Sequence, residues 1–204
     1  MFSRDITLKT VPVKSIRPTQ MTVGFREVQL KRQGWKARRE DKRPEFIEGH
    51  MIPIVVGPKD RFYAIDHHHL IRALSEEGVE GVLTTTVAHL NNLTKSAFWN
   101  FMEHRGWCRP FDEKGQRCPY EDMPKEIGLL TDDPYRSLAG ELRRAGGFSK
   151  DTTPFSEFLW ADFFRPRLSV KALRSDFDAQ ISKAVDLARS EDANYLPGWC
   201  GPCD

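Results

Sequence analysis

The succession of elements between residues 51 and 78 constrains the fold most strongly. Residues 51–57 ("MIPIVVG") form a short apolar run that is typical of a buried strand, and residues 58–61 ("PKDR") carry turn chemistry. A second strand is predicted over residues 62–66 ("FYAID"), so the two strands should form a hairpin. A helix follows at once, because Leu70, Ile71, Ala73 and Leu74 form an apolar stripe at helical spacing. Gly78 marks the end of this helix.

The remaining elements predict an α+β fold in which a small mixed sheet with helices is followed by a helical C-terminal half. Alternating and β-branched residues indicate strands over residues 6–17 and 80–90, and a loosely helical pattern covers residues 22–39. Residues 43–50 are irregular or form a short helix. Further helices are predicted over residues 94–104, 135–146, 154–164 and 169–189. We therefore predict an α+β core at residues 1–93 and a helical extension packed on it at residues 94–204.

Composition places the chain among folded proteins. Hydrophobic residues make up 39% and charged residues 29% of the 204 positions, which argues against disorder. No window approaches the roughly 18 consecutive apolar residues of a membrane helix, so we expect no membrane association. The N-terminal residues lack the apolar core of a signal peptide, and the expected location is cytoplasmic. The oligomeric state is not predictable from these features.

The net charge of +2 indicates no partner, but residues 26–43 ("REVQLKRQGWKARREDKR") concentrate positive charge. Two interpretations stay open. Acids interrupt the run, so it can be a solvated helix face. Alternatively, it binds phosphate on a nucleotide or a nucleic acid, and DNA binding would then depend on Lys31, Arg32, Arg38 and Arg39.

The four cysteines are Cys108, Cys118, Cys200 and Cys203. The tail "GWCGPCD" contains a CxxC spacing, but only one residue follows it, so the helix that lowers the thiol pKa in redox motifs cannot form. A four-cysteine zinc site is conceivable, although its two halves lie far apart in the sequence. We predict reduced thiols and no metal site.

The predicted junction between the second strand and the helix carries Asp66 and three consecutive histidines, His67, His68 and His69. Asp66 is a suitable N-cap, and the amides of the next turn and the helix dipole would then attract an anion. Protonated imidazoles would add donors, and histidine can carry protons near pH 7. Successive helical residues point in different directions, which argues against one metal ion. A purely structural polar junction is the third alternative.

The stretch "PIVVGPKDRFYAIDHHHLIRAL" resembles the core of the ParB/sulfiredoxin superfamily, and "VPVKSIRPTQMTVG" resembles the strand and proline turn that precede it there. The stretches "DDPYRSLAGELRRAGGFSKDTTPFSEFLWADFFR" and "LPGW" resemble the ParB-like nuclease branch, which has the Asp-His-His-His signature. The resemblance implies a nucleotide-handling fold that places phosphates at the helix N-terminus. By position, Asp66, His68 and His69 match the acidic residue and two histidines of the superfamily motif.

The chain departs from that motif at three positions. His67 replaces its glycine, and Leu70 replaces its arginine, although Arg72 lies close enough in sequence to reach a phosphate. Gln20 stands where the serine kinases of the superfamily have a catalytic glutamate, which puts serine phosphorylation by their mechanism in doubt. Glu27 is the nearest carboxylate that could replace it.

Two hypotheses follow from the resemblance. In the first, the protein is a nucleotide-dependent phosphotransferase or hydrolase that uses ATP, ADP or another nucleotide with Mg²⁺ and a small-molecule acceptor. His67, His68 and His69 would hold phosphate, Arg72 would neutralise it, and Thr19, Gln20 and Gly24 would face the acceptor. In the second, it is a non-catalytic module that binds a nucleotide or DNA. The sequence favours the enzyme, because lysine or arginine would bind phosphate at every pH.

Overall fold

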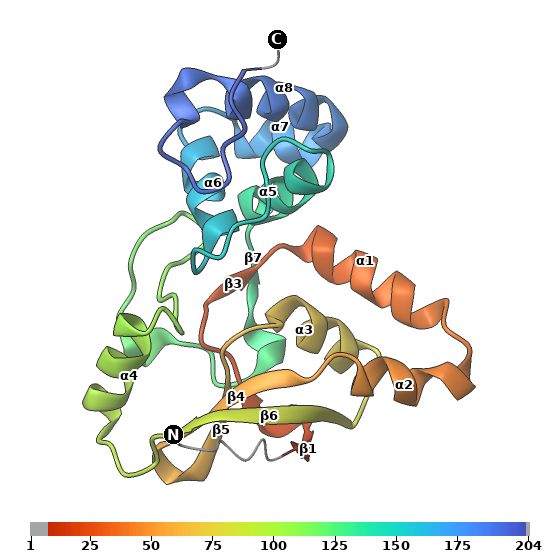
Figure 1. Ribbon diagram of the computed structural model, residues 1–204, viewed down its shortest axis with the longest axis vertical. Coiled ribbons are helices and arrows are strands. Elements are labelled where there is room, and N and C mark those ends of the chain that lie inside the picture. The colour runs from red at the N-terminus through yellow and green to blue at the C-terminus, as the bar shows by residue number, and fades with distance from the viewer. Residues whose placement is uncertain (1–7, 203–204) are drawn as a thin grey trace.

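The central feature of the fold is a five-stranded mixed sheet, seen in a computed structural model that describes residues 8–202 (Figure 1). Its strands lie in the order β1 (Leu8–Pro12), β6 (Gly81–His89), β4 (Ile52–Gly57), β5 (Arg61–Ala64) and β2 (Ile16–Arg17). β1 pairs antiparallel with β6 and β4 antiparallel with β5, whereas the β6–β4 and β5–β2 pairs are parallel. The predicted α+β fold with a small mixed sheet is confirmed.

The predicted hairpin is the β4–β5 pair. Its turn is a short 3₁₀ segment, η3 (Pro58–Asp60), in which Lys59 and Asp60 adopt positive φ angles of 62° and 53°. Aspartate tolerates this left-handed conformation better than most residues. The turn residues identified in the sequence therefore close the hairpin in register.

Helices cover both faces of the sheet because successive strand residues point to opposite faces. Ile54 joins the core beneath α1 (Phe25–Lys36) and α3 (His68–Glu76), whereas the next residue, Val55, joins Phe98 of α4 (Lys95–His104) on the other face. Short elements flank this layer. They are η1 (Val13–Ser15), η2 (Glu40–Lys42) and α2 (Arg43–Glu48).

The chain after α4 contributes to a second, two-stranded sheet before it enters the helical part. It passes through η4 (Tyr120–Asp122) and η5 (Ile127–Leu129), and β7 (Thr131–Asp132) then pairs with β3 (Thr22–Val23). The helical part has its own core around Trp160 and forms the upper body in Figure 1. Its elements are α5 (Pro134–Arg144), α6 (Ser156–Phe164), α7 (Val170–Ser175), α8 (Phe177–Arg189) and η6 (Glu191–Ala193). The division at residue 93 stays a prediction.

Three predicted elements need correction. The strand over 6–17 is divided into β1 and β2 by η1, and residues 6 and 7 lie outside the described residues. The helix over 22–39 begins only at Phe25, because β3 precedes it. The helix over 169–189 is divided at Asp176, whose Oδ1 accepts a hydrogen bond from Ala179 N at 3.1 Å and so starts α8.

Ion pairs of two largely buried arginines connect the linker to the helical part. Arg165, the C-cap residue of α6, donates to Asp133, the N-cap of α5, and to Asp162 Oδ1 at 2.8 Å. Arg109 Nη2 donates to Asp162 Oδ2 at 2.9 Å. Across residues 8–202, no helix has the length and apolarity that crossing a bilayer would require.

Candidate functional site

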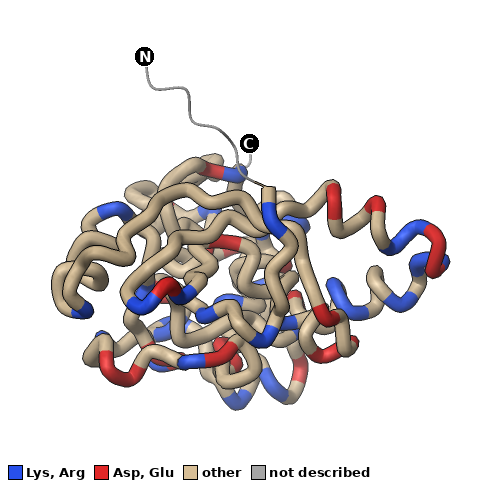
Figure 2. The backbone as a smooth tube through the Cα atoms, turned by 90° about the horizontal axis from the view of Figure 1, so that it is seen from below, with Lys and Arg blue, Asp and Glu red and all other residues tan. Residues whose placement is uncertain are grey.

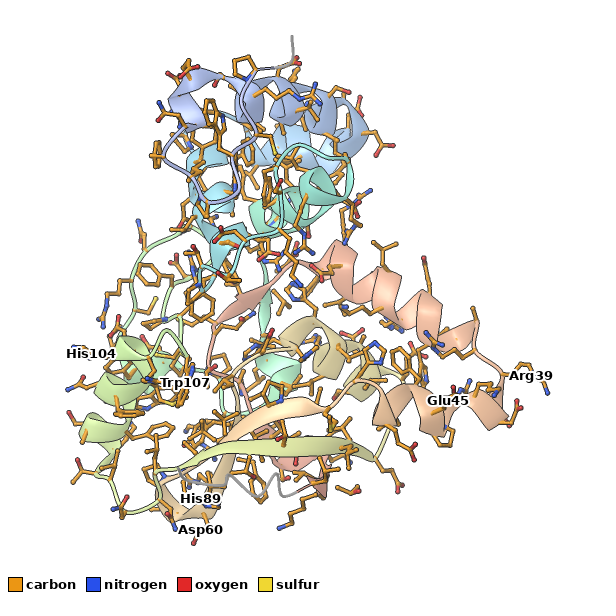
Figure 3. All side chains as sticks on the ribbon, in the orientation of Figure 1. Arg39, Glu45, Asp60, His89, His104 and Trp107 are labelled. Carbon is orange, nitrogen blue, oxygen red and sulfur yellow. The ribbon has the colours of Figure 1, made fainter. Side chains whose placement is uncertain are left out.

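A cavity of about 700 Å³ lies where α1 and α3 of the N-terminal half meet α5 and α6 of the helical half. One wall is the entire Asp66–His69 motif. The opposite wall is the segment 150–158, and Trp107, labelled in Figure 3, contributes from the linker after α4. The charged side chains of the lining are Glu27, Lys31, Asp66, Arg136, Arg143, Lys150, Asp151 and Glu157.

The chain enters α3 through an unusual backbone conformation. His67 is the N-cap residue and lies in the left-handed region, with φ 62° and ψ 21°. The prediction that Asp66 is the N-cap is therefore wrong: α3 begins at His68, and Asp66 Oδ1 accepts from His67 N at 2.6 Å. Glycine adopts this conformation without strain, which gives a physical reason for the glycine of the superfamily motif at this position.

The first turn of α3 presents unpaired amides. Within residues 8–202, no acceptor contacts the backbone N–H of His68, His69 or Leu70, and no side chain caps the helix. His68 and His69 both line the cavity. Free amides and the positive end of the helix dipole together favour a bound anion.

The side chain of His68 has a positioning role. It is 3% exposed, and its Nε2 accepts the Thr19 amide at 3.1 Å, while Thr19 Oγ1 donates to Ala64 O at 2.8 Å. Burial lowers the pKa of His68 to about 4, although Asp66 opposes this shift. The neutral ring therefore joins the start of α3 to the loop before α1, and the Thr19 hydroxyl attaches that loop to the end of β5.

His69 makes the equivalent contact one residue further. Its Nε2 accepts the Gly24 amide at 3.0 Å, and burial, reinforced by Arg136, lowers its pKa well below the usual value. Because Nε2 is the acceptor, the proton of the neutral ring is on Nδ1. The part of the chain that the structure describes offers this Nδ1–H no acceptor, and His69 lines the cavity.

The three histidines do not have the pKa values that the predicted role as proton carriers near pH 7 would require. Burial is the main cause that lowers the pKa of His67 as well, so none of the three imidazoles gains a proton readily near pH 7. The expectation of protonated imidazole donors is wrong for His68 and His69, because their Nε2 atoms already accept main-chain amides. Their N–H groups and backbone amides remain as neutral donors.

The other predicted site residues divide into two groups. Gln20 is 5% exposed and lines the cavity, and its Nε2 donates to Thr22 O at 2.6 Å. Thr19 and Gly24 do not line the cavity, and their amides bind the two buried histidines instead. A Cβ on Gly24 would lie 2.7 Å from Ser137 Oγ and 2.8 Å from Ser137 N, so glycine is needed where α1 meets α5. The prediction that Thr19 and Gly24 face a ligand directly is not supported.

Arg72 points away from the cavity. Its Nη1 donates to the carbonyls of Ile127 at 3.1 Å, Gly128 at 2.6 Å and Leu130 at 3.1 Å, and its Nε donates to Glu76 at 2.6 Å. The three carbonyl contacts attach η5 and the adjoining Leu130 to α3. The expectation that Arg72 neutralises phosphate is therefore wrong, because Arg72 does not line the cavity and its Nε and Nη1 donate to protein acceptors.

The cations of the helical half were not predicted from the sequence. Glu27 does lie in the cavity wall as predicted, and its Oε2 is 3.2 Å from Arg136 Nη1 and 3.7 Å from His69 Nε2. Arg143 lies on the same face of α5 and pairs with Glu157 at 2.7 Å. One sequence feature could have indicated these cations: Gly140 lies between Arg136 and Arg143 on α5. A Cβ there would lie 3.2 Å from Arg136 Nη1 and 3.3 Å from Glu27 Oε2.

The three cysteines among the described residues, Cys108, Cys118 and Cys200, do not line the cavity. Cys108 is buried, and burial raises the pKa of its thiol to about 12. Cys203 lies outside the described residues, so the four-cysteine zinc site stays untested. In residues 8–202, no group of three or more His, Cys, Asp or Glu side chains is arranged to hold a metal ion.

Comparison with known proteins identifies the family. A family model described as "Putative ParB-like nuclease" matches residues 9–166. The chain belongs to this ParB-like family. The match includes every residue that lines the cavity, since these fall between Gln20 and Phe158. The predicted membership in the ParB-like branch is confirmed.

Two solved structures are similar to this chain to different degrees. The crystal structure of protein Atu1540 from Agrobacterium tumefaciens is 50% identical to this ParB-like chain, with a TM-score of 0.91, and the alignment covers 97% of this chain and 99% of that one. A truncated chromosome-partitioning protein ParB from Caulobacter crescentus, complexed with CTP-gamma-S, is 11% identical with a TM-score of 0.32 over 92% and 94% of the two chains. No curated protein matches the chain significantly.

Proposed function

We propose that this ParB-like protein binds a nucleoside di- or triphosphate in the cavity, with phosphate oxygens at the N-terminus of α3. The observation that carries the proposal is the set of donors in the cavity wall that have no acceptor among the described residues: the amides at the start of α3 and the Nδ1–H of His69, a residue whose exposed fraction is 7%. An anionic ligand in the cavity would supply acceptors for these donors.

The rest of the lining suits a nucleotide. Trp107, Phe155 and Phe158 give the cavity aromatic surface against which a base can stack. Lys31 and Lys150 add positive charge that phosphate would compensate. A volume of about 700 Å³ is within the range of small-molecule sites.

Asp66 is the residue that would contact Mg²⁺. It is exposed and lines the cavity, and one of its oxygens already accepts the His67 amide. A single carboxylate is sufficient when the nucleotide phosphates and water provide the other ligands, as is usual for Mg²⁺. The metal would neutralise phosphate charge in that position.

A second candidate function is transfer of a phosphoryl group to a small-molecule acceptor, or to water. The observation that favours it is Glu27, a carboxylate with 15% side-chain exposure that lines the cavity beside Lys31 and Arg136. A carboxylate in that position can accept the proton of an attacking hydroxyl. Gln20 would orient the acceptor through its amide, because it cannot take a proton.

A nucleic-acid interface has weaker support. Basic residues of the run 26–43 are paired with acids, as Arg32 is with Glu76 and Glu77 at 2.9 and 2.6 Å. The elements α1, η2 and α2 (residues 25–48) form an arm that projects from the sheet (Figure 3), and at its tip Arg39 pairs with Asp41 at 3.1 Å. Figure 2 shows basic and acidic residues interspersed along this arm and over the rest of that view. The arm therefore lacks the continuous positive face that tracks a phosphate backbone.

The test of nucleotide binding is a thermal-shift and calorimetric screen with ADP, ATP, CTP and GTP, with and without Mg²⁺. A ligand that binds only the folded state must raise the melting temperature. Lys31→Gln should weaken nucleotide binding roughly 3- to 10-fold, as expected for a partly screened charge. Lys36→Gln is the matched control, because Lys36 lies on the same helix outside the cavity. If no nucleotide shifts the melting temperature of the parent, the proposal fails.

The phosphoryl-transfer candidate has its own test. Glu27→Gln should abolish nucleotide turnover, measured as phosphate release with and without added hydroxyl acceptors, while nucleotide binding is weakened but still measurable. Turnover that survives this substitution would exclude Glu27 as the base. A parent that binds nucleotide without turnover would leave the protein as a binding module.

A further inference from the structure

Arg136 is a buried arginine whose hydrogen-bonding capacity is largely unused. It projects from α5 into the cavity wall, and its side chain is 9% exposed. A guanidinium has five N–H donors, yet Arg136 donates one hydrogen bond, from Nη1 to Glu27 Oε2 at 3.2 Å. Glu157 Oε2 lies 3.9 Å from Nη2, which is an ion-pair distance beyond hydrogen bonding. The buried Nε has no acceptor among the described residues.

Two other inner arginines are better satisfied: Arg72 donates four hydrogen bonds, and Arg165 donates to Asp133, Asp162 and Glu113. Arg109 is under-bonded like Arg136, since its side chain donates one hydrogen bond, to Asp162, and its buried Nη1 has no acceptor among the described residues. Of these four arginines, only Arg136 lines the cavity. An under-bonded buried charge is costly unless something else supplies acceptors, so the position of Arg136 points to an oxyanion in the cavity.

The surroundings of Arg136 supply further donors. Arg143 lies on the same face of α5, Lys150 follows in the loop, and α6 begins beside them with Phe155 as its N-cap. Apart from α3, whose uncapped start forms the other anion site, the other helices of eight residues or more within residues 8–202 receive a side-chain acceptor at their N-terminus: α1 from Asp132, α4 from Thr94, α5 from Asp133 and α8 from Asp176. α6 has no such cap, and the Glu157 amide has no acceptor in the described part of the chain.

We propose that Arg136 is the centre of a second oxyanion subsite, formed with Arg143, Lys150 and the start of α6, that receives a carboxylate or phosphate group. This inference deepens the proposed function and rests on it: the ligand, or ligand pair, carries an acidic group in addition to the phosphates at α3. The group is either the terminal phosphate of the nucleotide itself or the acid of a second small molecule. Both sources share the oxyanion that a guanidinium binds through two parallel hydrogen bonds.

The subsite is tested by isothermal titration calorimetry on the full chain with Arg136→Lys and Arg136→Gln. Arg136→Lys keeps the positive charge beside Glu27 but lacks the two parallel donors of the guanidinium. It can therefore test the subsite even if Arg136→Gln does not fold. Arg144→Gln is the matched control, because Arg144 lies on the same helix, bonds Glu141 and does not line the cavity. Arg143→Gln, at a more exposed position of the same subsite, decides the question if both Arg136 variants unfold.

Two probes distinguish the source of the oxyanion. If it belongs to a second molecule, inorganic phosphate should bind the nucleotide-saturated parent, and both Arg136 variants should lose roughly 10- to 100-fold in that affinity. If it is the terminal phosphate of the nucleotide, the nucleotide-saturated parent should bind no inorganic phosphate. The parent should then bind a nucleoside triphosphate at least tenfold more tightly than the corresponding diphosphate, and the Arg136 variants should lose this preference.

The outcome that overturns the inference is equal binding, within twofold, of every probe by the parent and by the Arg136 variants. Failure of the proposed function gives a different result. In that case no nucleotide binds the parent, and inorganic phosphate is titrated into the free protein. A loss of phosphate binding in the Arg136 variants but not in Arg144→Gln then supports the subsite, and its absence refutes it.

Discussion

Lowering the pH from 7 to 5 should destabilise the protein through the buried imidazole of His68. Burial lowers the pKa of His68 from 6.5 to about 4 in the folded state. The unfolded chain therefore binds the proton more tightly, so the stabilisation is fully present above about pH 6.5 and is lost as the pH falls towards 4. One pKa unit corresponds to about 1.4 kcal/mol, so the whole effect is about 3 kcal/mol. About 2 kcal/mol of it is lost between pH 7 and pH 5.

The assay is urea unfolding at several pH values on the parent and on His68→Gln. A glutamine Oε1 can accept the Thr19 amide in place of Nε2, but it does not titrate. The variant should lose about 2 kcal/mol less stability than the parent between pH 7 and pH 5. His104→Gln, at an exposed histidine labelled in Figure 3, is the matched control and should follow the parent. Identical pH dependence in the parent and His68→Gln would refute the assignment of His68 as a neutral acceptor.

Three further predictions test the geometry around the cavity. Gly24→Ala should lower the unfolding free energy by roughly 1–3 kcal/mol, because its Cβ would lie 2.7–2.9 Å from atoms of Ser137. Unchanged stability in urea unfolding would contradict this and show that α5 can move to accommodate the methyl group. Arg72→Ala should cost roughly 2–4 kcal/mol of stability but leave nucleotide affinity within twofold of the parent, and weaker binding at full stability would contradict its position outside the cavity. Asp66→Asn should remove the Mg²⁺ dependence of nucleotide binding in thermal-shift assays, and a retained Mg²⁺ effect would exclude Asp66 as its ligand.

Local signals were sufficient to predict most elements of the fold. The β4–β5 hairpin follows from turn residues that close it directly, and α3 follows from an apolar stripe that packs on the sheet. The errors lie where distant contacts override local pattern. The helix predicted from residue 22 loses its start to β3, because Thr22 and Val23 pair with β7, more than 100 residues later in the sequence. The break at Asp176 was missed because an aspartate inside a helical pattern can also be a surface residue.

The candidate site was predictable in its location but not in its roles, and the reason is geometric. Three consecutive histidines suggest a shared chemistry, yet each occupies a different environment at the start of α3: His67 holds the left-handed conformation, and His68 and His69 bind the amides of Thr19 and Gly24. Which ring is buried depends on how the loop before α1 packs, and nothing within the motif determines that packing.

The cations that complete the cavity come from residues 136–150, which lie in a different half of the chain from the histidine motif. Glu27 links the two, because its carboxylate contacts both His69 and Arg136. A substitution at Glu27 should therefore disturb both walls of the cavity at once, whereas Lys31→Gln should affect only the electrostatic contribution of one wall. Comparing the binding losses of these two variants separates the positioning of the donors from their charge.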